Sequence, residues 1–181
     1  MEFIKKNPKI IILSGKAQSG KNETANIIKE YYETKNKKTV ILAYASYLKM
    51  YAKEITNWDG SEDTKPRDLL QQLGVELIKN KINPNMLINR IIEDIKIYEY
   101  FFDTIIISDA RFVDEIETIK KNYSNISVIH IIGNKNNLTD AQRNHPTEIG
   151  LDNYNKYDYE INNKETKQEL KKIIFNLLEE V

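Results

Sequence analysis

A glycine-rich segment near the N-terminus holds the residues whose spacing points most directly to chemistry. The pattern is G-x-x-x-x-G-K, formed here by Gly15, Lys16, Ala17, Gln18, Ser19, Gly20 and Lys21. Glycines let the backbone curl so that several N–H groups point at one anion, and a following helix adds its positive dipole end. Lys21 would face solvent and reach the outer phosphates of a nucleotide. The segment, called the P-loop below, predicts a nucleotide-phosphate site; the alternative is a glycine turn with a solvated lysine.

The position after the P-loop departs from the usual pattern. Asn22 stands where a Ser or Thr hydroxyl usually meets Mg²⁺. An amide oxygen can also ligate a hard cation, so Asn22 is a candidate metal ligand. Glu23 follows it and is counted with the P-loop among the expected nucleotide-binding residues.

Two charged residues follow the apolar run 104–108. Asp109 could hold Mg²⁺ through water or orient a substrate, and the alternative is a cap for the next helix. Arg111 carries a fork-shaped guanidinium that suits bidentate capture of a phosphate. The alternative role of Arg111 is a surface salt bridge with Asp114 or Glu115. Beside a P-loop, we favour the functional interpretation of both residues.

Further candidates lie on a predicted helix and in an irregular segment. Arg67 and Gln71 are four residues apart, so they share a helix face, which on spacing alone is a solvated face. Arg143, His145 and Glu148 cluster in the segment 133–150. An arginine there could neutralise charge on a phosphoryl group during transfer, whereas His145 could be a packing residue.

The elements that would position these residues alternate between strand and helix. Continuous apolar runs predict buried parallel strands, at 9–14, 39–43, 104–108, 127–132 and 159–161. Helical periodicity indicates helices at 22–34, 44–55 and 66–78. A further helix is expected to begin at Asn83 and Pro84, another to follow Arg111 and end at about residue 121, and a last one to lie at the C-terminus. The helix from Pro66 has an expected apolar stripe of Leu69, Leu70, Leu73, Leu77 and Ile78.

This order predicts one α/β domain over 1–181 with ligands at the carboxyl ends of the strands. We expect the three-layer fold of P-loop NTPases, with a mostly parallel five-stranded sheet and helices on both faces. A helical insert beside the sheet would occupy about 45–100. The long segment 133–150 would be a lid.

The composition excludes several classes of protein. Lys plus Arg and Asp plus Glu both number 27, and a net charge of zero argues against a general nucleic-acid binder. The chain has no cysteine, so it has no disulfide framework and no thiol nucleophile. No apolar run reaches membrane-spanning length and no secretory signal is visible. We therefore expect a cytoplasmic protein without a membrane partner, and a homodimer stays open.

The motifs resemble those of the phage-type deoxynucleoside monophosphate kinases, within the wider nucleoside monophosphate kinase group. The matching segments, in chain order, are Ser14 to Asn22, Tyr44 to Lys49, Arg67 with Leu70 to Gly74, Lys79, Ser108 to Phe112 with Glu115, His145 to Glu148, and Asp158 with Ile161 and Asn163. Three positions depart from the family pattern: Asn22 replaces Asp, Tyr47 replaces Pro, and Leu87 replaces Trp.

The resemblance implies phosphoryl transfer from ATP to a deoxynucleoside monophosphate, with Mg²⁺, and small-molecule nucleotides as the partners. It implies these substrate-binding residues: Lys49, Arg67, Gln71, Leu87, Asp109, Arg111, Glu115, His145 and Glu148. The expected catalytic residues are Lys21, Asp109, Arg111 and Arg143, and the expected metal ligands are Asn22 and Asp109. A phosphomevalonate kinase of the animal type, a dephospho-coenzyme A kinase and a non-catalytic nucleotide-binding module are the alternatives.

Overall fold

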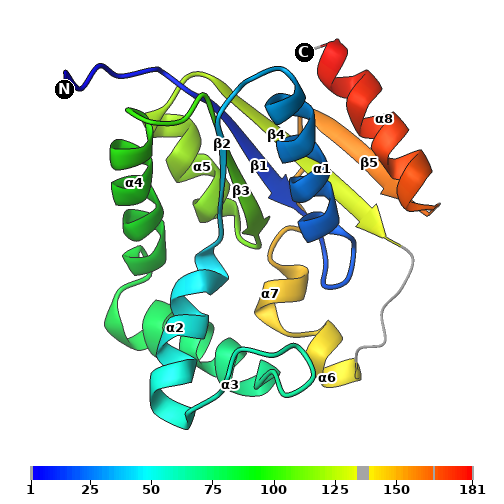
Figure 1. The fold of residues 1–181 in the computed structure, drawn as a ribbon. Helices are drawn as coiled ribbons and strands as arrows, with labels where there is room; N and C mark the ends of the chain where they lie inside the picture. Colours follow the sequence, from blue (N-terminus) through cyan, green and yellow to red (C-terminus); the bar gives the residue numbers. More distant parts are fainter. Residues whose placement is uncertain (1, 134–138, 165, 181) are drawn as a thin grey trace.

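A computed structural model gives the arrangement of residues 2–133, 139–164 and 166–180 (Figure 1). Its centre is a sheet of five strands in the order β2-β3-β1-β4-β5, and every neighbouring pair is parallel. The strands are β1 (Lys9–Ser14), β2 (Thr39–Leu42), β3 (Thr104–Ala110), β4 (Ile126–Gly133) and β5 (Tyr159–Asn163). The predicted parallel sheet is confirmed, with small shifts at the ends of the strands.

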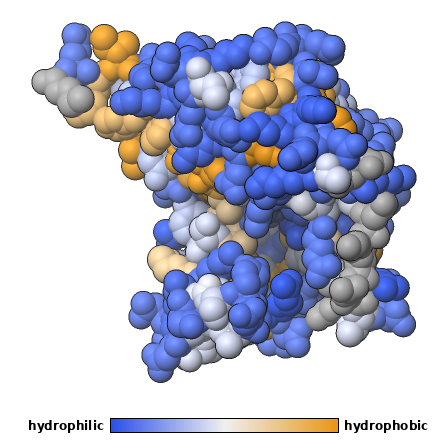
Figure 2. Space-filling model, turned by 45° about the vertical axis from the view of Figure 1, so that its right-hand side comes forward, coloured by the Kyte–Doolittle hydropathy of each residue, from blue (hydrophilic) through white to orange (hydrophobic). Residues whose placement is uncertain are grey.

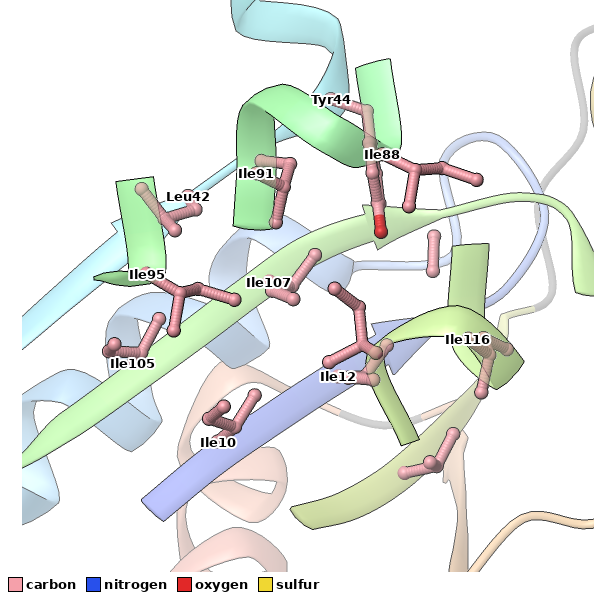
Figure 3. Packing of buried hydrophobic residues seen from close by; sticks show 13 residues of the cluster. Ile10, Ile12, Leu42, Tyr44, Ile88, Ile91, Ile95, Ile105, Ile107 and Ile116 are labelled. Atoms are coloured by element: carbon pink, nitrogen blue, oxygen red, sulfur yellow. The ribbon is translucent and has the colours of Figure 1, made fainter. Parts of the chain in front are cut away.

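Helices cover both faces of this sheet, which is why its strands are apolar throughout. Ile10 and Ile12 of β1 face one side, while Ile11 and Leu13 face the other, and all four are buried. The first side packs against α4 (Met86–Tyr98) and α5 (Val113–Asn122), as Figure 3 shows for α4. The second packs against α1 (Lys21–Thr34) and α8 (Lys167–Glu179).

The remaining helices lie beyond the carboxyl ends of the strands, where the fold predicts the ligands (Figure 1). They are α2 (Tyr44–Thr56), α3 (Arg67–Gln71), a π-helix η1 (Gln72–Ile82), and the short helices α6 (Asp140–Arg143) and α7 (Pro146–Ile149). The segment expected to be irregular thus contains α6 and α7, and its residues 134–138 lie outside the described part of the chain.

The helix predicted from Pro66 differs from the α-helical expectation. It becomes a π-helix at Gln72, and i→i+5 hydrogen bonding places more residues in each turn. Three residues of the predicted stripe, Leu70, Leu73 and Ile78, are buried as expected, and the stripe departs from the prediction at Leu77. Leu77, expected in the core, is 42% exposed, while Val75 is buried in its place.

The start of α4 was predicted wrongly by two residues. Asn83 ends η1, with its N–H donating to the carbonyl of Ile78. Its side-chain oxygen then accepts from the N–H of Asn85 at 2.9 Å, and Asn85 is the residue that precedes α4. The wide last turn of the π-helix uses the residue that would otherwise have capped α4.

None of the described helices is both long enough and apolar enough to cross a lipid bilayer.

Candidate active site

The backbone of the P-loop requires its two glycines. Gly15 has φ 143° and Gly20 has φ 96°, both in a region that favours glycine. A Cβ at Gly15 would lie 2.4 Å from the carbonyl oxygen of Ile131 in β4. Asn163, at the end of β5, donates its side-chain N–H to the carbonyl of Ser19 at 2.9 Å. Two neighbouring strands thus hold the loop in shape.

Lys21 is buried, contrary to the expectation that it faces solvent. It is 6% exposed, and its ammonium donates to the carbonyls of Gly15 at 2.8 Å and Lys16 at 2.6 Å. Burial, with a smaller contribution from the nearby guanidinium of Arg111, lowers the pKa of Lys21 to about 7. The lysine folds back because the curled loop presents its carbonyls to the nearest donor.

A cavity of about 600 Å³ opens beside the P-loop. It brings together most of the residues selected from the sequence: Ala17 to Asn22, Lys49, Arg67, Gln71, Leu87, Asp109, Arg111, Glu115 and Glu148. Its walls come from the P-loop, α2, α3, η1, α4, and the turn between β3 and α5. In Figure 2 the surface is hollowed between the body that carries the sheet and the smaller lower part.

Asp109 holds the start of α2. One carboxylate oxygen accepts from the N–H of Tyr44 at 2.8 Å and the other from the N–H of Ala45 at 2.9 Å. These are N–H groups that the first turn of a helix leaves without partners. Asp109 therefore caps α2 and not α5, the helix that follows it in the sequence. Burial raises the pKa of Asp109, and the two N–H groups oppose that rise.

Arg111 lies between the P-loop and α7. Its guanidinium donates to Glu148 at 2.8 Å and reaches the carbonyl of Thr147 at 3.4 Å. The second oxygen of Glu148 accepts from the P-loop N–H of Ala17 at 2.7 Å. The salt-bridge alternative considered for Arg111 is therefore half right: there is an ion pair, but its partner is Glu148 and it lies at the cavity.

Glu115 is a second buried carboxyl at the cavity. One oxygen accepts from the backbone N–H groups of Arg111 at 2.6 Å and Phe112 at 3.1 Å, which fixes the start of α5. Burial raises the pKa of Glu115 to about 8, with a smaller contribution from Asp109. The raised pKa favours the protonated form of this carboxyl near neutral pH.

A cluster of cations lies at the cavity wall formed by α2, α3 and the loop before α3. Lys65 donates to the carboxylate of Glu62 at 2.8 Å, Arg67 approaches it at 3.7 Å, and Lys49 at 4.0 Å. Glu62 and Lys65 were not among the residues expected from the sequence, because their loop has no periodicity and only the charges next to Arg67 could have indicated them.

Five predicted site residues do not line this cavity. Arg143 is exposed in α6, where it approaches Asp140 at 3.8 Å. His145 caps α7, with its side chain accepting from the N–H of Thr147. Gly15 and Lys16 line a smaller cavity of about 220 Å³.

Glu23 also lies outside the cavity lining, in the first turn of α1. Its carboxylate forms an ion pair with Lys167 of α8 at 2.7 Å. This contact fastens the start of α1 to α8.

The donors beside the P-loop fit a magnesium ion in type. Asn22 is exposed at the start of α1, Asp109 is the penultimate residue of β3, and both line the cavity. Each offers oxygen, the ligand that Mg²⁺ takes while keeping several waters. Because both oxygens of Asp109 already accept a backbone N–H, a contact through water suits it better than direct ligation.

Comparison with known proteins agrees with this arrangement. Residues 31–174 match the family model for deoxynucleotide monophosphate kinase. The P-loop lies outside the matched range, so it is a separate observation. A search of curated proteins found no match.

Solved structures of low sequence identity share the fold. A sugar kinase from Janibacter sp. HTCC2649 has a TM-score of 0.58 at 12% identity, covering 95% of each chain. An APS kinase from Mycobacterium tuberculosis has a TM-score of 0.54 at 11% identity, covering 96% of this chain and 98% of its own. A shikimate kinase from Aquifex aeolicus has a TM-score of 0.51 at 15% identity, covering 94% and 96%.

These likenesses establish the P-loop kinase fold and leave the substrate open. The family model covers far more than half of the chain, and this protein therefore belongs to the deoxynucleotide monophosphate kinase family.

Proposed function

We propose that this protein transfers the terminal phosphoryl group of ATP to a (deoxy)nucleoside monophosphate, producing ADP and the (deoxy)nucleoside diphosphate. A phosphate oxygen of the acceptor attacks the γ-phosphorus of ATP, and the bond from that phosphorus to the ADP oxygen breaks. Membership of the family supports the reaction. An APS kinase of the same fold was solved in complex with AMPPNP and APS.

One observation carries the proposal: a single cavity connects the P-loop to the helices of the expected insert. The P-loop and Lys21 would bind the triphosphate of ATP. Arg67 and Gln71 would bind the acceptor, against the apolar wall that includes Leu87. Arg111 lines the same cavity and would neutralise charge on the group in transfer.

Magnesium would be held by Asn22 and Asp109 together with phosphate oxygens and water. When bound, it neutralises charge on the phosphates of the donor. The protein's own contribution is to hold the two nucleotides in line and to exclude water from the cavity. Residues 45–100 would serve as the acceptor-binding insert and 133–150 as the lid of one domain, and a homodimer stays a prediction.

A coupled assay of ADP release, run with ATP and Mg²⁺ across the nucleoside monophosphates and with phosphomevalonate, tests the proposal. We expect release that depends on one or a few deoxynucleoside monophosphates. If only phosphomevalonate causes ADP release, the protein is a kinase as proposed, but its acceptor is phosphomevalonate and not a nucleoside monophosphate. If calorimetry detects ATP binding while no acceptor causes release, the protein is a nucleotide-binding module and the proposal fails.

A further inference from the structure

Glu148 has a geometry that differs from that of a residue waiting for a substrate. It is 7% exposed, and each carboxylate oxygen already has a partner within the protein. One oxygen accepts from the guanidinium of Arg111 at 2.8 Å and the other from the P-loop N–H of Ala17 at 2.7 Å. A single carboxylate thus ties a cation on the β3–α5 turn to the anion-binding backbone of the P-loop.

The helix that carries Glu148 is fastened to the same turn. The carbonyl of Thr147 lies 3.4 Å from the guanidinium of Arg111, and His145 caps the first turn of α7. Gly150, the residue after α7, lies close to the backbone of Arg111. A Cβ at position 150 would be 2.6 Å from the carbonyl oxygen of Arg111. Any movement of α7 would therefore move Arg111 with it.

The charges explain why Arg111 needs this partner. Lys21 lies near enough for its positive charge to be disfavoured by Arg111, and burial together with this smaller repulsion lowers the pKa of Lys21 to about 7. Two carboxylates, those of Asp109 and Glu148, oppose the repulsion by favouring the charged form of Lys21, and Glu148 also forms an ion pair with Arg111. Glu148 supplies the negative charge in a nearly buried place, where a charge pair is screened little by solvent.

We propose that Glu148 is a positioning residue, which holds the guanidinium of Arg111 at the mouth of the P-loop and does not bind the substrate itself. This inference rests on the proposed function, because it gives Arg111 its place beside the phosphoryl group in transfer. Glu148→Gln removes the charge and keeps the shape. The amide oxygen can still accept from Ala17, whereas the ion pair with Arg111 is lost.

The first test uses the free protein and needs no activity. Nitrogen NMR of the Arg111 guanidinium should show slow rotation of its Nη groups in the wild type and fast rotation in Glu148→Gln. The matched control is Asp152→Asn, which removes an exposed carboxylate paired with Lys16 at 2.8 Å and should leave the Arg111 signals unchanged. Equal Arg111 rotation in wild type and Glu148→Gln would overturn the proposal.

The second test is a double-mutant cycle on turnover, with Glu148→Gln, Arg111→Ala and the double variant. We expect Glu148→Gln to lower kcat about 30-fold and to change the acceptor KM less than about threefold, because it misplaces a group that acts in the transition state. In the Arg111→Ala background the same substitution should change kcat less than about threefold. An equal fall of kcat in both backgrounds, or a raised KM with kcat unchanged, would show that Glu148 acts without Arg111.

The two tests separate the failure of this proposal from the failure of the proposed function. If the wild type transfers no phosphoryl group to any nucleoside monophosphate, the function is wrong, and the NMR experiment still decides whether Glu148 holds Arg111. If the wild type is active and the NMR or the cycle gives the contrary result, the positioning role alone is wrong.

Discussion

At the scale of single residues, the two arginines expected at the cavity, Arg111 and Arg67, already have carboxylate partners. Arg111 is paired with Glu148, and Arg67 and Lys65 lie around Glu62. The pairs differ in burial: Glu148 is nearly buried, whereas Glu62 is exposed. An exposed pair contributes little to stability, so a phosphate can replace Glu62 at small cost.

Arg111→Lys should lower kcat/KM for the acceptor about a hundredfold, equivalent to about 3 kcal/mol of transition-state stabilisation. Lysine keeps the charge but loses the fork that reaches Glu148 and a phosphate together. Steady-state kinetics measures the acceptor parameters, and calorimetry measures ATP binding, which should barely change. A collapse of ATP affinity would place Arg111 at the donor.

Asn22→Ser and Asn22→Asp should shift the Mg²⁺ concentration that gives half-maximal activity more than they shift the acceptor KM. Asn22 is exposed at the mouth of the P-loop, where a hydroxyl, amide or carboxylate oxygen presents a different ligand to the ion. Activity measured against Mg²⁺ in the three proteins tests this. An identical half-saturating concentration in all three would mean that Asn22 is not near the metal.

At the scale of elements, two helices that border the cavity begin on carboxyl groups. Asp109 caps α2 from the end of β3, and Glu115 holds the turn that leads into its own helix, α5. A helix start has N–H groups without partners, and these acids satisfy them from inside the cavity wall. Chemistry at Asp109 or Glu115 is therefore coupled to the placement of a helix.

Glu115→Gln should flatten the pH dependence of stability between pH 5 and 8. The folded-state pKa of about 8 lies above the ordinary 4.5, so the folded protein keeps a proton that the unfolded chain loses in this window. The stabilisation is full below pH 4.5 and is lost as the pH rises through 8, at up to about 1.4 kcal/mol per pH unit.

Urea titrations at several pH values measure this slope, and Gln can still accept the two backbone N–H groups at position 115. The matched control is Glu93→Gln, at an exposed site on α4, which should keep the wild-type slope. A wild-type slope in Glu115→Gln as well would mean that Glu115 titrates normally.

The segment 133–150 should close over bound nucleotides. Its described part carries Glu148, which contacts the P-loop, and Arg143, which is exposed in α6 and away from the cavity. Hydrogen exchange at residues 139–150 should slow when an ATP analogue and the acceptor are both present, because closure buries these amides. Exchange that is the same with and without both ligands would argue against a lid.

At the scale of the whole molecule, the helical insert shares its core with the sheet. Ile88, Ile91 and Ile95 of α4 are buried in one cluster with Ile105 and Ile107 of β3 (Figure 3). A smaller cluster around Trp58 joins α2, α3 and η1. Because α2 starts on Asp109 of β3, this cluster is also tied to the sheet.

Unfolding should therefore be a single transition for the whole chain. Trp58 is the only tryptophan and is 9% exposed within the insert, so its fluorescence reports on that part alone. Its urea transition should coincide with the far-UV circular dichroism of the whole protein. Ile91→Ala should move both transitions together, by about 3 kcal/mol. Separate midpoints would mean that the insert is a second folding unit.

The sequence by itself determined the strands, most helices and the P-loop. Continuous apolar runs and helical periods are properties of neighbouring residues, so they need no knowledge of distant contacts. The glycines of the P-loop could be recognised in the sequence for the same reason, because the positive φ angles of Gly15 and Gly20 are required within one short segment. The parallel topology then placed Asp109 and Arg111 beside the P-loop, because β3 pairs with β1.

Only the tertiary structure decided how the charged residues are used. The partners of Asp109 lie 64 and 65 residues away, and the partner of Glu148 in the P-loop lies 131 residues away. Lys21 is buried, and Val75 rather than Leu77 enters the core of the insert, for similar reasons. A local pattern shows which residues can pair or pack, but the packing of distant elements selects which of them do, because the cost of burying a charge depends on the partner that the fold brings to it.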